Sequence, residues 1–164
     1  MTTTATQAAN AAGHRGPAAL KTGHVGLNVS DVERSIAFYG AVLGLEVQAE
    51  GQEPERRWAF LGQDGQLLVT LWHKSSGRFS TGTPGPHHLS FQVDSIEQVQ
   101  AVQATLTELS AEFAYDGVVP HGEGMASGGI YFTDPDGIRL EVYAPSGAAA
   151  APAPTSGAPT CGFF

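Results

Sequence analysis

The sequence predicts an α+β fold in which two tandem βαβββ modules form a cupped, barrel-like sheet with the helices outside. The segment His24–Val29 alternates apolar with polar residues and precedes an amphipathic stretch, and the segment His88–Val93 starts the same order again. Each half then contains three further short apolar runs bounded by turn residues. Because one such module is too small to bury its own sheet, we expect the two to close on each other.

The first module is predicted from strand alternation and from a helical repeat. Every second residue of Val25–Val29 is a larger aliphatic side chain, which gives the strand one apolar face. Ser30 and Glu33 have the spacing of a capping box, and the apolar residues that follow recur at helical spacing until Gly44 ends the helix. The other predicted strands are Leu45–Ala49, Trp58–Leu61 and Leu67–His73, with a turn at Gln63–Gly65.

The second module repeats this order. A strand over His88–Val93 is followed by Ser95 as the helix N-cap and by one apolar helical stripe from Ile96 to Leu109. The turn signal Asp134-Pro135-Asp136-Gly137 matches the turn of the first half. The other predicted strands are Phe113–Asp116, Gly129–Thr133 and Ile138–Tyr143.

Composition and charge restrict the class of protein. The chain has 164 residues, enough for one domain with a real core. A formal net charge of −8 and a pI near 5.0 argue against nucleic acid and membrane surfaces as partners. No apolar run is long enough to span a bilayer, and the first residues lack the apolar core of a signal peptide. The single Cys161 cannot form an intrachain disulfide, which favours a cytoplasmic location.

The two ends of the chain differ in composition from the middle. Residues 1–21 and 146–164 are rich in Ala, Thr, Gly, Pro and Ser, and we predict that both are disordered because they carry little apolar surface. The last residues, Cys161-Gly162-Phe163-Phe164, are either an uninformative tail or a peptide that docks into a groove and supplies a soft ligand or a lid. The predicted domain and its two modules are residues 22–145, 22–74 and 86–145.

Two histidines and one glutamate are the candidate metal ligands. His24 and His88 open the two matching strands, and Glu141 lies in the last strand. Two imidazoles and one carboxylate can form a facial triad that leaves coordination positions open on a divalent metal. A carboxylate in a half-buried strand needs a cationic partner, for which a metal competes with Arg139. Either histidine alone could be a hydrogen-bonded core residue, but the three together favour metal binding.

The chain resembles the vicinal oxygen chelate superfamily over about residues 22–145. That superfamily includes glyoxalase I, fosfomycin-resistance thiol transferases, antibiotic-sequestering proteins and type I extradiol dioxygenases. The paired His-strand-helix openings and the ending Asp134–Glu141 carry the resemblance. It implies that His24, His88 and Glu141 are metal ligands, and that a site can be completed by two halves or by two chains, so we expect a homodimer.

The number of carboxylates separates the reactions of this superfamily. Aligning the Asp-Gly turns of the two halves puts Val69 opposite Glu141, so the first half offers no second carboxylate ligand. This argues for a three-ligand site and against glyoxalase I.

A second resemblance is to the extradiol ring-cleavage dioxygenase signature. It is carried by Val119-Pro120-His121, a Gly-rich loop one residue longer than in that signature, Ile130–Gly137 and Glu141. The resemblance implies that His73 steadies the bound oxygen species, and that His121 and Tyr131 handle protons and bind the substrate. Strand parity places His73 on the face of Val69 and predicts that Tyr131 also lines the cup.

The resemblance makes an extradiol-type dioxygenase the leading prediction. Such an enzyme would use non-haem Fe(II), with Mn(II), Zn(II) or Ni(II) as other metals, to cleave a catechol-like small molecule with O₂. The first alternative is another metal-dependent enzyme of the superfamily: a lyase, an isomerase or a thiol transferase. The second is a non-catalytic protein that binds a drug or metabolite; it ranks lower because sequestering relatives usually lack the ligand triad.

Overall fold

The computed structural model describes residues 21–162, and the predicted disordered arm lies outside them except for Lys21. The N-terminal module has the predicted order, with a parallel β1–β4 pair in a sheet ordered β1-β4-β3-β2. Its elements are β1 (Val25–Val29), α1 (Val32–Leu43), β2 (Glu46–Gly51), the short 3-10 helix η1 (Pro54–Arg56), β3 (Trp58–Gln63) and β4 (Gln66–His73).

The C-terminal module repeats the topology with the sheet order β5-β8-β7-β6, which confirms the predicted α+β fold of two βαβββ modules. The strand predicted over Phe113–Asp116 is wrong: only a single bridge joins Phe113 to Phe132, and the outer strand comes later in the chain. The elements are β5 (Leu89–Gln92), α2 (Ile96–Glu108), β6 (Val119–Pro120), β7 (Gly128–Thr133), β8 (Arg139–Ala144) and the 3-10 helix η2 (Thr160–Gly162).

The helix ends follow the predicted capping chemistry with one correction. The N-cap of α1 is Asp31, whose side chain accepts from the amide of Arg34 at 3.0 Å, so the predicted Ser30–Glu33 box does not form. Gly44 ends this helix in the left-handed conformation, with φ of 65°. In α2 the predicted N-cap Ser95 is confirmed and forms a capping box.

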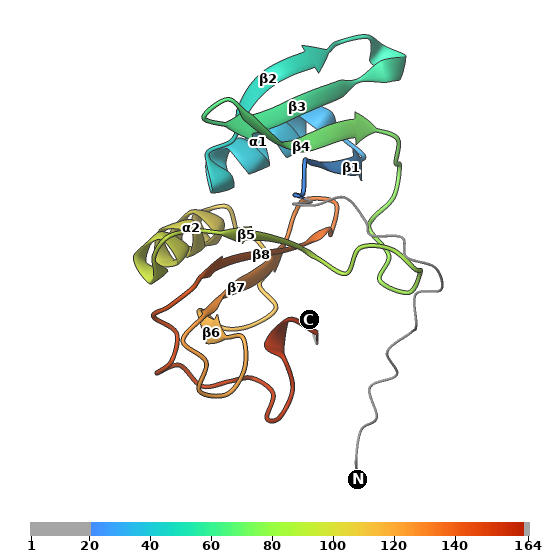
Figure 1. Cartoon of the computed structure of the whole chain (residues 1–164). Coiled ribbons are helices and arrows are strands. Elements are labelled where there is room, and N and C mark those ends of the chain that lie inside the picture. Colours follow the sequence, from blue (N-terminus) through green and yellow to red (C-terminus); the bar gives the residue numbers. More distant parts are fainter. Residues whose placement is uncertain (1–20, 163–164) are drawn as a thin grey trace, which may run out of the picture.

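The two modules meet through the faces that their helices cover. Phe38 of α1 contacts Phe132 of β7 with ring centroids 6.4 Å apart. Beside it, the Tyr39 hydroxyl donates to the buried Asp134 carboxylate at 3.0 Å, and Ser30 donates to Asp136. Both helices belong to this boundary, where one apolar core joins the modules. Figure 1 shows the two sheets on either side of it.

Each sheet therefore has a second face that carries no helix, which we call its helix-free face. Because the helix-covered faces face each other, the two helix-free faces point away from each other, and the sheets are cupped but not closed into one barrel. The predicted closure of the two modules into one cup is thus absent within residues 21–162.

The C-terminal tail differs from its predicted disorder. Residues 146–162, which we call the C-terminal strap, fold back past the β6–β7 loop (Figure 1). Ala148 and Thr160 are buried there and make backbone hydrogen bonds to the C-terminal module. The low apolar content of these residues did not predict their order, because the strap is held by hydrogen bonds rather than by a large apolar surface. Phe163 and Phe164 lie outside the described residues.

No helix within residues 21–162 has the length and apolar character needed to cross a membrane.

Candidate metal centre

Glu141 is the centre of a buried polar cluster on the helix-free face of the C-terminal sheet. Its neighbours Leu140 and Val142 point into the core, so strand alternation turns Glu141 to the other face. Its side chain is 4 % exposed. The His121 Nε2 atom lies 2.6 Å from Glu141 Oε1, and the His88 Nε2 atom lies 3.4 Å from Oε2. A buried carboxylate thus has two imidazole nitrogens directed at it.

Hydrogen bonds keep this carboxylate ionised. Burial by itself would raise the pKa of Glu141, but hydrogen bonds from His121, Ser90 and Tyr131 outweigh it and hold the pKa below its ordinary value. The Ser90 hydroxyl donates at 2.6 Å from the strand position directly opposite. The result is an anionic, largely desolvated oxygen pair, which is the electrostatic setting that a divalent cation requires.

Tyr131 lies beside Glu141 on the neighbouring strand. The two residues are directly paired in the β7–β8 register, and Tyr131 is fully buried. Burial first, and then the charge of Glu141 and a hydrogen bond to it, raise the pKa of Tyr131. The phenol therefore keeps its proton at neutral pH and acts as a hydrogen-bond donor.

His121 comes from the loop between β6 and β7, residues 121–127, which we call the His121 loop. Its Nδ1 atom lies 2.9 Å from Ser127 Oγ, and its ring lies against Tyr143 with centroids 5.0 Å apart. The side chain is 21 % exposed, so it closes one side of the cluster while remaining accessible. Four predicted site residues are thus brought together: His88, His121, Tyr131 and Glu141.

His87 also contributes to this cluster, although strand alternation turns it to the face opposite His88, so the strand pattern alone does not reveal it. Arg139 Nη1 lies 3.2 Å from His87 Nε2, and His87 Nδ1 lies 2.9 Å from His88 Nδ1. Since arginine can only donate, His87 accepts at Nε2, and its neutral ring can then donate from Nδ1 to His88. Slight burial, followed by the charges of His88 and Arg139, lowers the pKa of His87, which agrees with a neutral ring. The sequence feature that could have revealed this contact is the pair of adjacent histidines, His87-His88.

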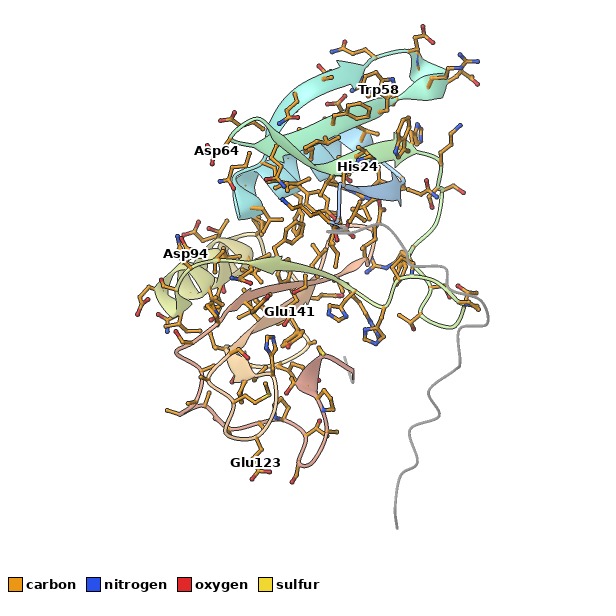
Figure 2. The ribbon with its side chains drawn as sticks, viewed as in Figure 1. His24, Trp58, Asp64, Asp94, Glu123 and Glu141 are labelled. Atoms are coloured by element: carbon orange, nitrogen blue, oxygen red, sulfur yellow. The ribbon has the colours of Figure 1, made fainter. Side chains whose placement is uncertain are left out.

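His24 does not join this cluster. It is exposed at the start of β1, and Figure 2 places it on the N-terminal module, apart from Glu141. Among residues 21–162, no group of three or more His, Cys, Asp and Glu side chains could hold a metal ion. The C-terminal module therefore fits the carboxylate and imidazole part of a metal site, whereas the predicted triad is not assembled within one chain.

The register corrects the predicted counterpart of Glu141. Ser90 pairs with Glu141, and the equivalent position Gly26 pairs with Thr70, so the counterpart is Thr70 and not Val69. By strand parity His73 shares the face of the core residue Val69, so the parity argument for it does not hold. At the end of β4 it nevertheless lines one pocket with Trp58 and Trp72, and its predicted role stays a prediction. The absence of a carboxylate at the counterpart position still holds, because threonine occupies it.

The helix-free face of the N-terminal sheet carries aromatic rings instead of ionisable groups. Trp58, Phe60 and Trp72 form a cluster with centroid separations of 4.7, 6.0 and 6.3 Å. Trp72 is 37 % exposed, although its indole N–H donates to Thr70 at 3.0 Å. These rings give the N-terminal sheet a partly exposed apolar face.

A cavity of about 430 Å³ adjoins the cluster where β1 approaches the start of β5. Gly26 and Asn28 line it from the N-terminal module, and His87, His88 and Arg139 line it from the C-terminal module. His88 therefore lies between this cavity and Glu141.

Comparison with known proteins assigns the family. Residues 21–142 match the model of the glyoxalase/bleomycin resistance protein/dioxygenase superfamily. The chain belongs to this superfamily. A glyoxylase/bleomycin resistance protein/dioxygenase domain from Frankia sp. EAN1pec has the same fold, with a TM-score of 0.65 and 26% identity, over 76% of this chain and 97% of that one.

Superfamily relatives differ in their reactions. Lactoylglutathione lyase of Haemophilus influenzae is 30% identical over 125 residues, covering 72% of this chain and 87% of the relative. Catechol-2,3-dioxygenase of Bacillus subtilis is 25% identical over 125 residues, covering 74% of this chain and 40% of the relative. Divalent metals occur in the superfamily, as in the Mn(II) complex of a Listeria monocytogenes FosX mutant, which shares the fold with a TM-score of 0.59 and 22% identity over 76% of this chain and 91% of that one.

Proposed function

We propose that this chain is a metal-dependent superfamily enzyme that cleaves a catechol-like aromatic with O₂, and that two copies complete its site. The observation that carries the proposal is the convergence of His121 and Tyr131 on the buried Glu141. A metal site that only bound a cation would not need a protonated phenol and a further imidazole around its carboxylate. Such groups suit a substrate whose protons move during the reaction.

A second copy supplies what one chain lacks. His88 and Glu141 lie on one helix-free face and His24 belongs to the other module, whose helix-free face points the opposite way. If the C-terminal module of one copy faces the N-terminal module of another, His24 can complete the ligand set. Two-fold symmetry would then give two equivalent sites per dimer.

The same pairing would place an aromatic wall opposite the ionisable cluster. Trp58, Phe60 and Trp72 would then face Glu141, and flat apolar rings favour a flat aromatic substrate through offset or edge-to-face contacts. An aromatic face and an ionisable face would therefore both suit a catechol-like substrate, which has a flat ring and two oxygens.

The roles of the side chains follow from their surroundings. When bound, a divalent metal supplies a Lewis acid for the vicinal oxygens and the site for O₂; Fe(II) is the proposed ion. Tyr131 keeps its proton and orients a substrate oxygen by donating a hydrogen bond. His121 exchanges protons with the substrate from the open side of the cluster, a role that suits imidazole at neutral pH. The buried surroundings restrict water.

A lyase or isomerase reaction is the second candidate, favoured by the 30% identity to lactoylglutathione lyase over most of that relative. Thr70 at the counterpart of Glu141 weighs against a site with two carboxylate ligands. The two reactions act on different substrates, so an activity assay with both substrates distinguishes them.

The experiment compares both reactions in one preparation. The protein is loaded anaerobically with Fe(II), Mn(II), Zn(II) or Ni(II), then given either a catechol panel with O₂ or the glutathione adduct of an α-ketoaldehyde. The proposal expects O₂ uptake with formation of a yellow ring-cleavage product in the Fe(II) or Mn(II) protein. Turnover of the glutathione adduct alone would establish the lyase instead, and metal binding without either reaction would leave a binding protein.

A further inference from the structure

The C-terminal strap holds the His121 loop at both ends. At the start of the loop, the Thr160 amide donates to the carbonyl of His121 at 2.8 Å, and the Thr160 hydroxyl donates to the carbonyl of Pro120 at 2.6 Å. At the far end, the Ala148 amide donates to the carbonyl of Ala126 at 2.9 Å. The strap is thus a brace across the loop that presents His121 to Glu141.

Thr160 is the most firmly held residue of this brace. It is fully buried, and its own carbonyl accepts a hydrogen bond from the Tyr115 hydroxyl at 3.1 Å. The Tyr115 ring in turn lies edge-on against Tyr131, with centroids 5.5 Å apart. One threonine is therefore connected to the loop of His121 on one side and to the neighbour of Tyr131 on the other.

The His121 loop has a composition that calls for such a brace. Gly122 and Gly124 give its backbone unusual freedom, and Gly124 takes a positive φ of 73°. Ordering glycine costs more conformational entropy than ordering other residues. The hydrogen bond from the His121 amide to the Ser127 carbonyl, 3.0 Å, closes the loop on itself, and the strap fixes it to the sheet.

We infer that Thr160 is a positioning residue, which fixes the His121 loop so that the His121 ring stays on Glu141. The effect of this residue on metal binding or catalysis rests on the proposed function. Its effect on the position of the His121 ring does not, because that position can be measured in the protein without metal. Loss of the Thr160 hydroxyl leaves the Pro120 carbonyl unpaired in a buried place and loosens the start of the loop.

The test compares three threonine variants of the full chain. Thr160→Val keeps the shape and removes the hydroxyl, Thr160→Ser restores the hydroxyl, and Thr155→Val makes the same change elsewhere in the strap, at a half-buried residue. Two measurements are made on each: the imidazole ¹H–¹⁵N signals of His121 without metal, and Mn(II) affinity by isothermal titration calorimetry. Thermal unfolding checks that the variants fold.

The expected result is specific to Thr160. Thr160→Val shifts or broadens the His121 imidazole signals and weakens Mn(II) binding about 10-fold, at the lower end of outer-shell effects. Thr160→Ser restores both values, and Thr155→Val leaves both unchanged. Unchanged His121 signals in a folded Thr160→Val protein would overturn the inference.

Two further outcomes keep the inference separate from the proposed function. If the wild type does not bind Mn(II) or any other metal, the proposed function fails, and the His121 signals alone decide the role of Thr160. If Thr160→Val does not fold, Tyr115→Phe removes the hydrogen bond to Thr160 from the other side. It should change the His121 signals in the same direction by a smaller amount, and the absence of any change would count against the inference.

Discussion

The N- and C-terminal modules have the same topology but carry different chemistry at matched positions. On the first sheet Gly26 pairs with Thr70, and on the second Ser90 pairs with Glu141. One face is aromatic and half-exposed, and the other is a buried cluster of ionisable groups. Duplication of the fold has therefore not duplicated the site. In the proposed dimer each module supplies one wall of the site, which would account for a carboxylate centre without a complete ligand set in one chain.

The largest effect is expected at this matched pair. Glu141→Gln keeps the shape of the side chain but removes its charge, so we expect metal affinity to fall by more than about 100-fold and turnover to be lost. Thr70→Val, the change at the counterpart position, should leave metal affinity intact. Elemental analysis and calorimetry measure the metal, and circular dichroism measures folding. Equal metal content in Glu141→Gln and wild type would remove Glu141 from the ligand set.

The two histidines outside the predicted triad give the next largest contrast. His121 contacts Glu141, whereas His73 is exposed at the end of β4 on the face of Val69. His121→Ala should lower turnover of a catechol by about 10²–10⁴-fold even at a metal concentration high enough to fill the site. His73→Ala serves as the control and should turn over normally. The reverse pattern would restore the original prediction for His73 and refute the placement of the site on the C-terminal module.

Much of the fold was predictable because period-2 and helical patterns occur twice in the same order. The error of one residue between Val69 and Thr70 has a physical cause. The first hairpin turns through Asp64 and Gly65 and carries an irregular register between Leu61 and Gly62, so its turn cannot be aligned with the longer second turn. A one-residue shift moves every side chain to the opposite face, and it carried His73 with it.

The site was predictable only in part, because some of its contacts follow from strand alternation and others depend on segments that are far apart in the sequence. Glu141 and His88 follow from strand parity, and Tyr131 follows from the register of the next strand. The contact of His87 with His88 depends on where the chain bends before β5, and the order of the strap depends on carbonyls more than 20 residues away in sequence. Neither leaves a periodic pattern in the chain.

Sharing of the site between two copies can be tested by mixing inactive variants. His24→Ala and Glu141→Gln each damage a different wall, so a dimer of one copy of each retains one intact site. With random exchange about half of the dimers are mixed, so the whole mixture should recover about a quarter of the wild-type metal content. His88→Ala mixed with Glu141→Gln is the control, because both changes affect the same wall, and no recovery is expected. Failure of the first mixture despite proven exchange would place the complete site within one chain.

The smallest effect concerns the boundary that keeps the two walls apart within a chain. Tyr39 of α1 donates to Asp134, and both groups are buried. Burial, the Asp134 charge and this hydrogen bond raise the pKa of Tyr39, so the hydroxyl remains a donor. Tyr39→Phe leaves the Asp134 carboxylate with the backbone amides of Asp136 and Ile138, and should destabilise the protein by about 1–3 kcal/mol.

Tyr143→Phe provides the matched control for this boundary, since its hydroxyl donates to Gln92 at 2.7 Å in an exposed position. Its cost should stay within about 0.5 kcal/mol in urea unfolding of the metal-free protein. The comparison also bears on the site. If a single chain had to open this boundary to bring His24 to Glu141, Tyr39→Phe would tighten metal binding while lowering stability. Unchanged metal affinity in a destabilised Tyr39→Phe protein is expected instead, because a site completed by a second copy leaves the boundary closed.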